Sequence, residues 1–196
     1  MSSPIVALVA FVFAAATTPG PTNAIASASG ANFGYRRSLP FILGGMLGLP
    51  ALIVVIGLGL GQLFKAHPAL HDGLKGAGSA YLLYLAWKIA TAGRPRSDGG
   101  GRPLTFVEAA LFQWVNPKGW LASVSALAAF SRGAETYPAD TLLVAATFFV
   151  CLFLGQSAWC LFGTAIGRLL VSQRALTAFN VCMGALIVAS IALLYL

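Results

Sequence analysis

Six apolar stretches, each about twenty residues or longer, follow one another along almost the whole chain. At about 1.5 Å per residue, a helix of ~20 residues crosses the ~30 Å hydrocarbon core of a bilayer. Of the 196 residues, 58% are hydrophobic and only 9% are charged, which is too few polar residues for a water-soluble domain. We therefore predict an all-α integral membrane protein. Its six expected transmembrane helices cover residues 4–30, 39–63, 73–92, 104–131, 139–167 and 175–196.

One segment near the middle of the chain has the composition of a linker. It reads "GRPRSDGGGRP", from Gly93 to Pro103, and it separates three helices from three. An odd number of helices makes the second half enter the membrane from the opposite side, so a duplication would give inverted repeats. We predict a single transmembrane domain, 1–196, made of two inverted three-helix repeats, 1–93 and 104–196, joined by the linker 94–103.

Helix-breaking residues interrupt the first and the fourth apolar stretch. The first contains Pro19, Gly20 and Pro21, and the fourth contains "NPKG", in which Pro117 follows Pro19 by 98 positions, half the chain length. A proline removes a backbone donor and frees a carbonyl about one turn earlier, which is costly in lipid. Unwound backbone persists there only where it is buried in protein or lines a wet cavity. We therefore predict that the first and fourth helices are broken and that both breaks face a cavity.

The residues beside the breaks are suited to a zwitterionic ligand. A helix that restarts after a break points its first N–H groups, with about half a positive charge, at the space before it, which favours a carboxylate. Lys118 adds a full charge, and we expect it either to face a substrate or act in gating, or else to snorkel or pair with the carbonyls that a break releases. Asn23 and Asn116 offer both donors and acceptors. Such a pair of interruptions in corresponding positions indicates a transporter binding site.

The basic residues are distributed unevenly over the two sides of the membrane. Three lie in or beside the even-numbered connections: Lys65, Lys75 and Arg132. Eight lie in or beside the odd-numbered ones: Arg36, Arg37, Lys88, Arg94, Arg96, Arg102, Arg168 and Arg174. The positive-inside rule predicts that the odd connections, including the linker, are cytoplasmic and that both termini are outside. Because the charges stand singly or in twos at helix ends, they indicate a lipid bilayer as the partner and no nucleic acid.

The sequence gives no sign of a metal site, a cofactor or a catalytic group. The three cysteines, Cys151, Cys160 and Cys182, lie in apolar stretches without CxxC spacing and are interpreted as small buried residues. His67 and His71 flank a proline in an expected connection, and Glu108 is expected to cap a helix N-terminus. The other acids, Asp72, Asp98, Glu135 and Asp140, are expected in connections. No phosphate-binding GxxxxGK[ST] loop is present, so ATP hydrolysis by the chain and enzymatic activity are not predicted.

Glycine pairs and an aromatic helix complete the candidate features. Glycines four residues apart let helices approach closely, and three such pairs occur: Gly44 and Gly48, Gly57 and Gly61, Gly163 and Gly167. Tyr81, Tyr84 and Trp87 are expected to anchor the third helix at the membrane interface. Tyr81 is the deepest of them and the one expected to reach a cavity.

Three segments carry a resemblance to a known family. They are "PGPTNAIASASGANFGYRRSLPFILGGMLG" from Pro19, "YLLYLAWK" from Tyr81 and "FVEAALFQWVNPKGW" from Phe106. With them the chain resembles the LysE/RhtB family of amino-acid exporters over nearly its whole length. The resemblance implies a six-helix inner-membrane protein that exports amino acids or close derivatives, powered by an ion gradient or the membrane potential.

The family motifs fall on particular positions of this chain. The first motif falls on Pro19, Gly20, Pro21, Asn23, Gly30, Gly34, Gly44 and Gly48, and the second on Asn116, Pro117 and Lys118. Thr22 stands where many members have Asn after PGP, and Glu108 and Ala109 replace a more usual basic-Gly pair. These departures leave the substrate open.

We predict a secondary transporter that exports small amino acids or derivatives across the bacterial inner membrane. The predicted substrate-binding residues are Pro19, Gly20, Pro21, Thr22, Asn23, Gly44, Gly48, Tyr81, Gln113, Asn116, Pro117 and Lys118. The alternative is an exporter of an inorganic ion or another small metabolite in the same superfamily, which would favour buried carboxylates or thiolates around the breaks. A homo-oligomer is compatible with either function.

Overall fold

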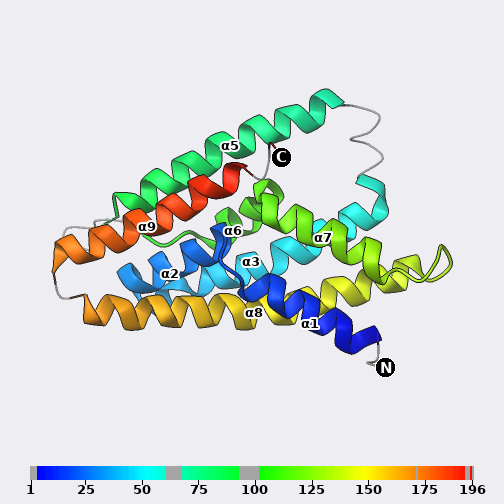
Figure 1. Ribbon diagram of the computed structural model, residues 1–196, viewed down its shortest axis with the longest axis horizontal. Coiled ribbons are helices and arrows are strands. Elements are labelled where there is room, and N and C mark those ends of the chain that lie inside the picture. Colours follow the sequence, from blue (N-terminus) through cyan, green and yellow to red (C-terminus); the bar gives the residue numbers. More distant parts are fainter. Residues whose placement is uncertain (1–3, 61–67, 93–101, 171, 193–194, 196) are drawn as a thin grey trace.

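The computed structural model describes residues 4–60, 68–92, 102–170, 172–192 and 195, and these residues form helices and turns without a strand. The helices run mostly along the long axis of the molecule (Figure 1). The helix pair formed by α5 (Pro68–Ala90) and α9 (Gln173–Ile191) lies along one side, and α8 (Tyr137–Leu169) lies along the opposite side. The predicted all-α class is confirmed for the described residues.

The first half of the chain begins with two helices that are sharply bent against each other. They are α1 (Pro4–Thr17) and α2 (Pro21–Phe33), and the bend between them is 54°. Next comes α3 (Tyr35–Val55), which continues into the wider turn η1 (Ile56–Leu60). The chain then reaches α5.

The second half contains the other break. Its first helix is α6 (Phe106–Phe112), followed by the tighter turn η2 (Gln113–Val115) and, after Asn116, by α7 (Pro117–Phe130). Asn116 itself has extended backbone, with φ −82° and ψ 107°. The helices α8 and α9 complete the chain. Both predicted breaks therefore exist.

The sequence analysis paired Pro19 with Pro117, but a different proline begins the restarted helix in the first half. Pro21 is the first residue of α2 and Pro117 is the first residue of α7. Proline is favoured at this position because its missing N–H has no helical partner there. Pro21, and not Pro19, is therefore the structural counterpart of Pro117.

Several helices are long and apolar enough to cross a membrane. Among the described residues these are 35–59, 137–169 and 173–191, and the bent pair of α1 and α2 forms a fourth if it is one span. The segment Phe106–Val115 is apolar but shorter. A multi-pass membrane protein is thus supported, while six spans in two repeats stay a prediction. Most of the predicted linker 94–103 lies outside the described residues.

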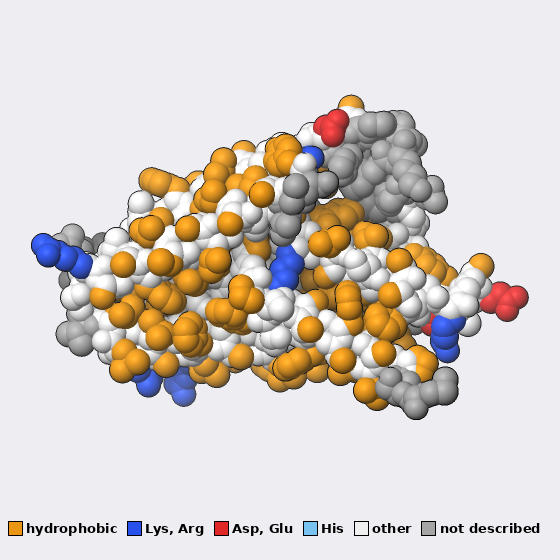
Figure 2. All heavy atoms as spheres, viewed as in Figure 1, with side chains coloured by type: hydrophobic (Ala, Val, Ile, Leu, Met, Phe, Trp, Pro, Cys, Tyr) orange, Lys and Arg blue, Asp and Glu red, His pale blue; other side chains and the backbone are white. Residues whose placement is uncertain are grey.

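The surface of the molecule fits a lipid environment. In Figure 2 hydrophobic side chains cover most of the face in view, and charged side chains stand near its two ends, at its upper edge and at one place in its middle. Large apolar side chains are widely exposed, among them Leu58, Trp87 and Leu169. Exposed apolar surface on this scale indicates contact with lipid rather than water.

Glycines hold α8 close to α2. A Cβ on Gly163 would collide with the carbonyl of Ser27, and a Cβ on Gly167 would collide with the carbonyl of Ala31. In the opposite direction, a Cβ on Gly30 would collide with the carbonyl of Cys160. The packing role predicted for Gly163 and Gly167 is therefore confirmed. This contact fixes α2, and with it one wall of the site described below.

Four sequence-based expectations about side chains need correction. His71 and Asp72 lie in the first turns of α5 rather than in a connection, while His67 and Asp98 fall outside the described residues. Cys151 and Cys160 are buried as predicted, but Cys182 is exposed. Asp140 is also misassigned, because it lies in the first turn of α8 and is buried.

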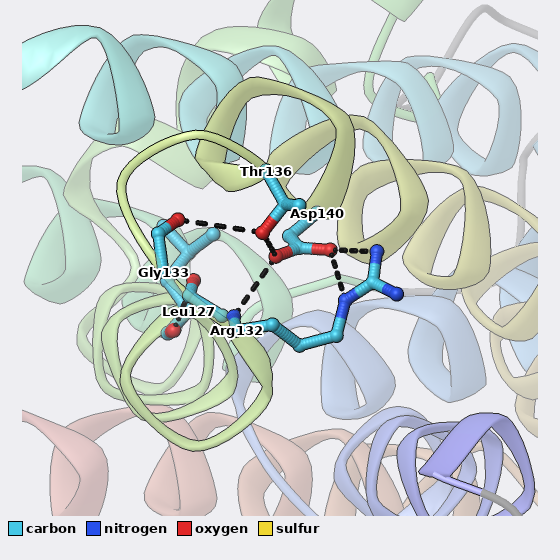
Figure 3. Close-up of polar contacts among 6 residues, drawn as sticks. Leu127, Arg132, Gly133, Thr136 and Asp140 are labelled. Carbon is cyan, nitrogen blue, oxygen red and sulfur yellow. Dashed lines mark hydrogen bonds and ion pairs between the residues drawn. The ribbon is translucent and has the colours of Figure 1, made fainter.

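Asp140 closes the connection between α7 and α8 (Figure 3). Its carboxylate accepts hydrogen bonds from the backbone N–H of Arg132 at 2.9 Å, from Arg132 Nη2 at 2.7 Å and from Thr136 Oγ1 at 2.9 Å. The hydrogen bond to Asp140 raises the pKa of the Arg132 guanidinium. Burial of this acid is possible because each of its oxygens has a donor.

Candidate functional site

The two broken helices meet at their breaks. Asn116 Nδ2 donates to Thr22 Oγ1 at 2.9 Å, so the residue before α7 contacts the first turn of α2. Lys118 Nζ donates to the carbonyl of Thr18 at 2.6 Å, to Thr18 Oγ1 at 2.7 Å and to the carbonyl of Pro19 at 3.2 Å. The breaks, which lie in opposite halves of the chain, therefore form one structural unit.

Side chains from five helices and both breaks surround a small cavity at this meeting point. Six predicted site residues line it: Gly20, Thr22, Asn23, Gln113, Asn116 and Lys118. The rest of the wall is apolar or small: Ala15, Ala16, Leu49, Gly119, Ala122, Phe148 and Leu152. The cavity volume is about 30 Å³. One water needs ~10–15 Å³ by this measure, so the cavity has room for about two.

Two amide groups in the cavity wall have unused hydrogen-bonding capacity. Gln113 is 1% exposed and Asn116 is 3% exposed. Gln113 Nε2 and Asn116 Oδ1 lack a partner among the described residues, although Asn116 Nδ2 also donates to Gln113 Oε1 at 3.1 Å. A buried donor or acceptor without a partner costs ~1–3 kcal/mol. The site therefore presents one free donor and one free acceptor close together.

The long side chain of Lys118 extends from α7 to the break between α1 and α2. It is partly buried, and its methylene chain packs on Gly20, where a Cβ would lie 2.6 Å from Lys118 Cδ. Gly20 thus leaves the room that Lys118 needs. The oxygens around the ammonium belong to a hydroxyl and two carbonyls, which are neutral. In this conformation, Lys118 therefore pairs with carbonyls that the break in the first helix releases.

Asn23 was predicted to bind the substrate, but its amide group donates to two backbone carbonyls of the protein. Its Nδ2 donates to the carbonyl of Ala16 at 2.8 Å and to the carbonyl of Thr18 at 2.8 Å. The Ala16 carbonyl lies in the last turn of α1 and the Thr18 carbonyl in the break, where neither has a helical donor. The Asn23 amide therefore supplies hydrogen bonds to two carbonyls that the break leaves without helical donors.

Both restarted helices lack a side-chain cap. The residues before them are Gly20 for α2 and Asn116 for α7, and neither provides a capping hydrogen bond to its helix. Ser, Thr, Asp or Asn commonly supplies that bond at a helix N-terminus. The first turns of α2 and α7 therefore keep their positive character toward the cavity.

The remaining predicted site residues do not line the cavity. Gly44 and Gly48 pack α3 against α6, since a Cβ on Gly44 would collide with the carbonyl of Phe106 and one on Gly48 would lie 2.6 Å from the carbonyl of Ala110. Tyr81 is half-buried and packs on an apolar cluster beside α5. The prolines act through the backbone: Pro19 gives its carbonyl to Lys118, while Pro21 and Pro117 start helices.

Glu108 has the capping role predicted for it. It forms a capping box with Thr105 at the start of α6, and Arg102 Nη1 lies 2.6 Å from Glu108 Oε2. The hydrogen bond to Glu108 raises the pKa of Arg102. Glu108 is not among the residues that line the cavity. Within the described part of the chain, no group of three or more His, Cys, Asp or Glu side chains is placed to hold a metal ion.

Sequence reasoning did not assign the apolar wall or the hydrogen bonds of Thr18 to the site. Leu49 comes from α3, and Phe148 and Leu152 come from α8. Their apolar character makes them indistinguishable from lipid-facing neighbours in the sequence. Thr18 is polar and adjacent to the break, so its position beside Pro19 was the available signal.

Comparison with known proteins identifies the class of this molecule. The sequence profile of the LysE type translocator family matches residues 13–195. The chain therefore belongs to the LysE type translocator family, a family of transporters and not of enzymes.

The chain is also similar to efflux proteins of Escherichia coli and Shigella. Cysteine/O-acetylserine efflux proteins of Escherichia coli (strain K12), Shigella flexneri and Shigella sonnei (strain Ss046) are each 36% identical to this chain over 116 residues. The matched segment spans 59% of this chain and 59% of each relative. No solved structure matches the chain.

Proposed function

We propose that this chain is a secondary transporter that exports small amino acids or close derivatives from the cytoplasm across the bacterial inner membrane. The observation that carries the proposal is the meeting of two broken helices around a cavity lined by a cation, a free donor and a free acceptor. A zwitterion needs these groups, because its carboxylate accepts hydrogen bonds and its ammonium donates them.

The polar groups suggest how an amino acid would bind. Its carboxylate would take hydrogen bonds from Gln113 Nε2 and Lys118, near the uncapped N-termini of α2 and α7. Its ammonium would donate to Asn116 Oδ1. The apolar side chains of Leu49, Phe148 and Leu152 would contact the methylene part of the substrate side chain.

Binding requires a change in the cavity. A volume of about 30 Å³ is too small for an amino acid, so the cavity must widen before one binds. Lys118 bridges the two breaks through the carbonyls of Thr18 and Pro19. A substrate carboxylate competes with these neutral oxygens for the ammonium, and charged acceptors bind more strongly. Exchange of partners at Lys118 would loosen the contact between the breaks as the substrate enters.

The membrane arrangement proposed for this transport is the six-helix one. The bent pair of α1 and α2 forms the first span, and α6, η2 and α7 form the fourth, as two inverted repeats would require. The connections that contain most of the basic residues are cytoplasmic, so both termini lie outside. Transport is then driven by an ion gradient or the membrane potential.

The substrate class proposed is small polar amino acids. The relatives are named for cysteine and O-acetylserine, and their similarity to this chain covers 59% of their length. A cavity with mixed polar and apolar walls suits a zwitterion with a short side chain.

Counterflow into proteoliposomes tests the proposal. Vesicles containing the purified protein are loaded with unlabelled O-acetylserine, cysteine, serine, alanine or lysine and diluted into a trace of the same labelled compound. We expect transient accumulation of label for the small polar amino acids and little for lysine. Absence of counterflow for every amino acid, with the protein inserted and monodisperse, would reject the proposed function.

A further inference from the structure

Gln156 is a buried polar residue that does not line the cavity between the two breaks. It lies in α8, is 0% exposed, and neither its Oε1 nor its Nε2 has a partner among the described residues. An unpaired buried amide costs free energy through both atoms. The buried amide of Gln156 therefore has a free donor and a free acceptor that a ligand could use.

The position of Gln156 places it next to the cavity. Leu152 lines the cavity, and Gln156 follows it by four residues on the same face of α8. On α3, Leu49 lines the cavity and Gly45 precedes it by four residues. Four residues advance a helix by about 6 Å, so Gln156 and Gly45 form the next layer along the bundle.

Gly45 and Gln156 contact each other across this layer. A Cβ on Gly45 would lie 2.6 Å from Gln156 Oε1 and 2.8 Å from Nε2. The amide group therefore rests against the backbone of α3 in the space that the missing side chain leaves. Gln156 lies between the cavity-lining residue Leu152 and the C-terminal end of α8, where Arg168 lies.

We propose that Gln156 and Gly45 form a polar subsite that binds the side-chain end of the transported amino acid. The subsite rests on the proposed function: the zwitterionic end binds at Asn116, Gln113 and Lys118, and the side chain extends one layer toward Gln156. An amide donates and accepts, so it matches a side chain with a carbonyl oxygen or a hydroxyl group, such as an ester or a carboxamide.

The subsite makes a prediction about selectivity that a packing role does not make. A site built to hydrogen-bond a polar substituent discriminates strongly against an analogue that lacks it, because its own groups are then left unpaired. Loss of the amide should therefore affect substrates with a polar side chain and spare alanine. A glutamine that only packs α3 against α8 would change stability, or the transport of all substrates, equally.

The test compares O-acetylserine with alanine in proteoliposome counterflow for the wild type, Gln156→Leu and Gly45→Ala. Leucine has a similar size without hydrogen-bonding atoms, and the methyl group of alanine displaces the movable amide without striking backbone atoms. We expect both variants to lower the O-acetylserine to alanine transport ratio about tenfold. Gln173→Leu, at an exposed glutamine in the first turn of α9, is the matched control and should leave the ratio unchanged.

The outcomes separate the subsite from the proposed function. A wild type that shows no counterflow with any of the five amino acids named above rejects the proposed function, and one that transports alanine but not O-acetylserine rejects the subsite alone. A wild type that transports both, with an unchanged ratio in the two variants or an equal loss of both substrates, rejects the subsite alone. If Gln156→Leu fails to insert, the ratio measured for Gly45→Ala decides.

Discussion

Asn116 and Thr22 stand 94 positions apart in the chain, and a hydrogen bond of 2.9 Å joins their side chains. This contact places the start of α7 against the start of α2. The two helix N-termini therefore share one cavity, and any ligand in it is in contact with both halves of the protein. A movement of one half against the other necessarily changes the shape of that cavity.

Replacement of Lys118 by Met is expected to abolish export. Methionine keeps the apolar stem that packs on Gly20 but has no charge and no donor. Both the bridge to Thr18 and the attraction for a substrate carboxylate are lost. We expect at least a tenfold lower counterflow rate in proteoliposomes, with membrane insertion unchanged.

The control for this variant is Lys88→Met. Lys88 lies in the last turn of α5 and contacts the ring of Tyr84 at 5.9 Å, away from the residues that line the cavity. Its transport should stay within about twofold of the wild type. Equal rates for Lys118→Met and the wild type would remove Lys118 from the site.

Replacement of Asn23 by Leu is expected to destabilise the first broken helix. The change removes both donors to the carbonyls of Ala16 and Thr18. The Thr18 carbonyl keeps its hydrogen bond from Lys118 Nζ, whereas the Ala16 carbonyl loses its side-chain donor, and an unpaired buried carbonyl costs ~1–3 kcal/mol. We expect a lower melting temperature in detergent. Thr147→Val, which removes only a hydroxyl bonded within its own helix, should melt like the wild type.

Gly163→Ala is expected to weaken the contact between α8 and α2. The added methyl group meets the backbone carbonyl of Ser27, which cannot move without shifting a helix. Overpacking of this kind costs ~1–3 kcal/mol. Gly76→Ala is the matched control, because a Cβ there meets open space. Equal melting temperatures for both variants would contradict the close approach of these helices.

Asp140→Asn is expected to open the connection between α7 and α8. The carboxylate accepts from Arg132 and Thr136 with both oxygens (Figure 3), whereas an amide replaces one acceptor with a donor facing a guanidinium. Trypsin should then cleave after Arg132 several times faster. Glu135→Gln, at an exposed acid of the same connection, should be cleaved at the wild-type rate.

The breaks could be predicted from the sequence because proline and glycine inside an apolar stretch have few physical interpretations. Gly20, Thr22, Asn116 and Lys118, which this reasoning assigned to the binding site, line one cavity, and their role in binding stays a prediction. The direction of the Asn23 amide could not be predicted, since that depends on where the end of α1 lies after a bend of 54°.

Other features depended on contacts that no local pattern contains. Gln156 is a single amide in a long apolar helix, and only its burial without a partner separates it from an ordinary packing residue. Gly44 matched a family motif, yet the reason for glycine there is the nearby backbone of α6. The burial of Asp140 could not be predicted, because it depends on the hydrogen bonds that Arg132 makes to it.

Equilibrium binding of a labelled substrate to the detergent-solubilised protein tests the central claim most directly. The ligand is the amino acid with the strongest counterflow, and the variants are Asn116→Leu, Gln113→Leu and the control Gln173→Leu. If the meeting of the two breaks is the binding site, Kd rises at least tenfold, or about 1.4 kcal/mol, for the first two variants and stays unchanged for the control. An unchanged Kd for both Asn116→Leu and Gln113→Leu would contradict the account.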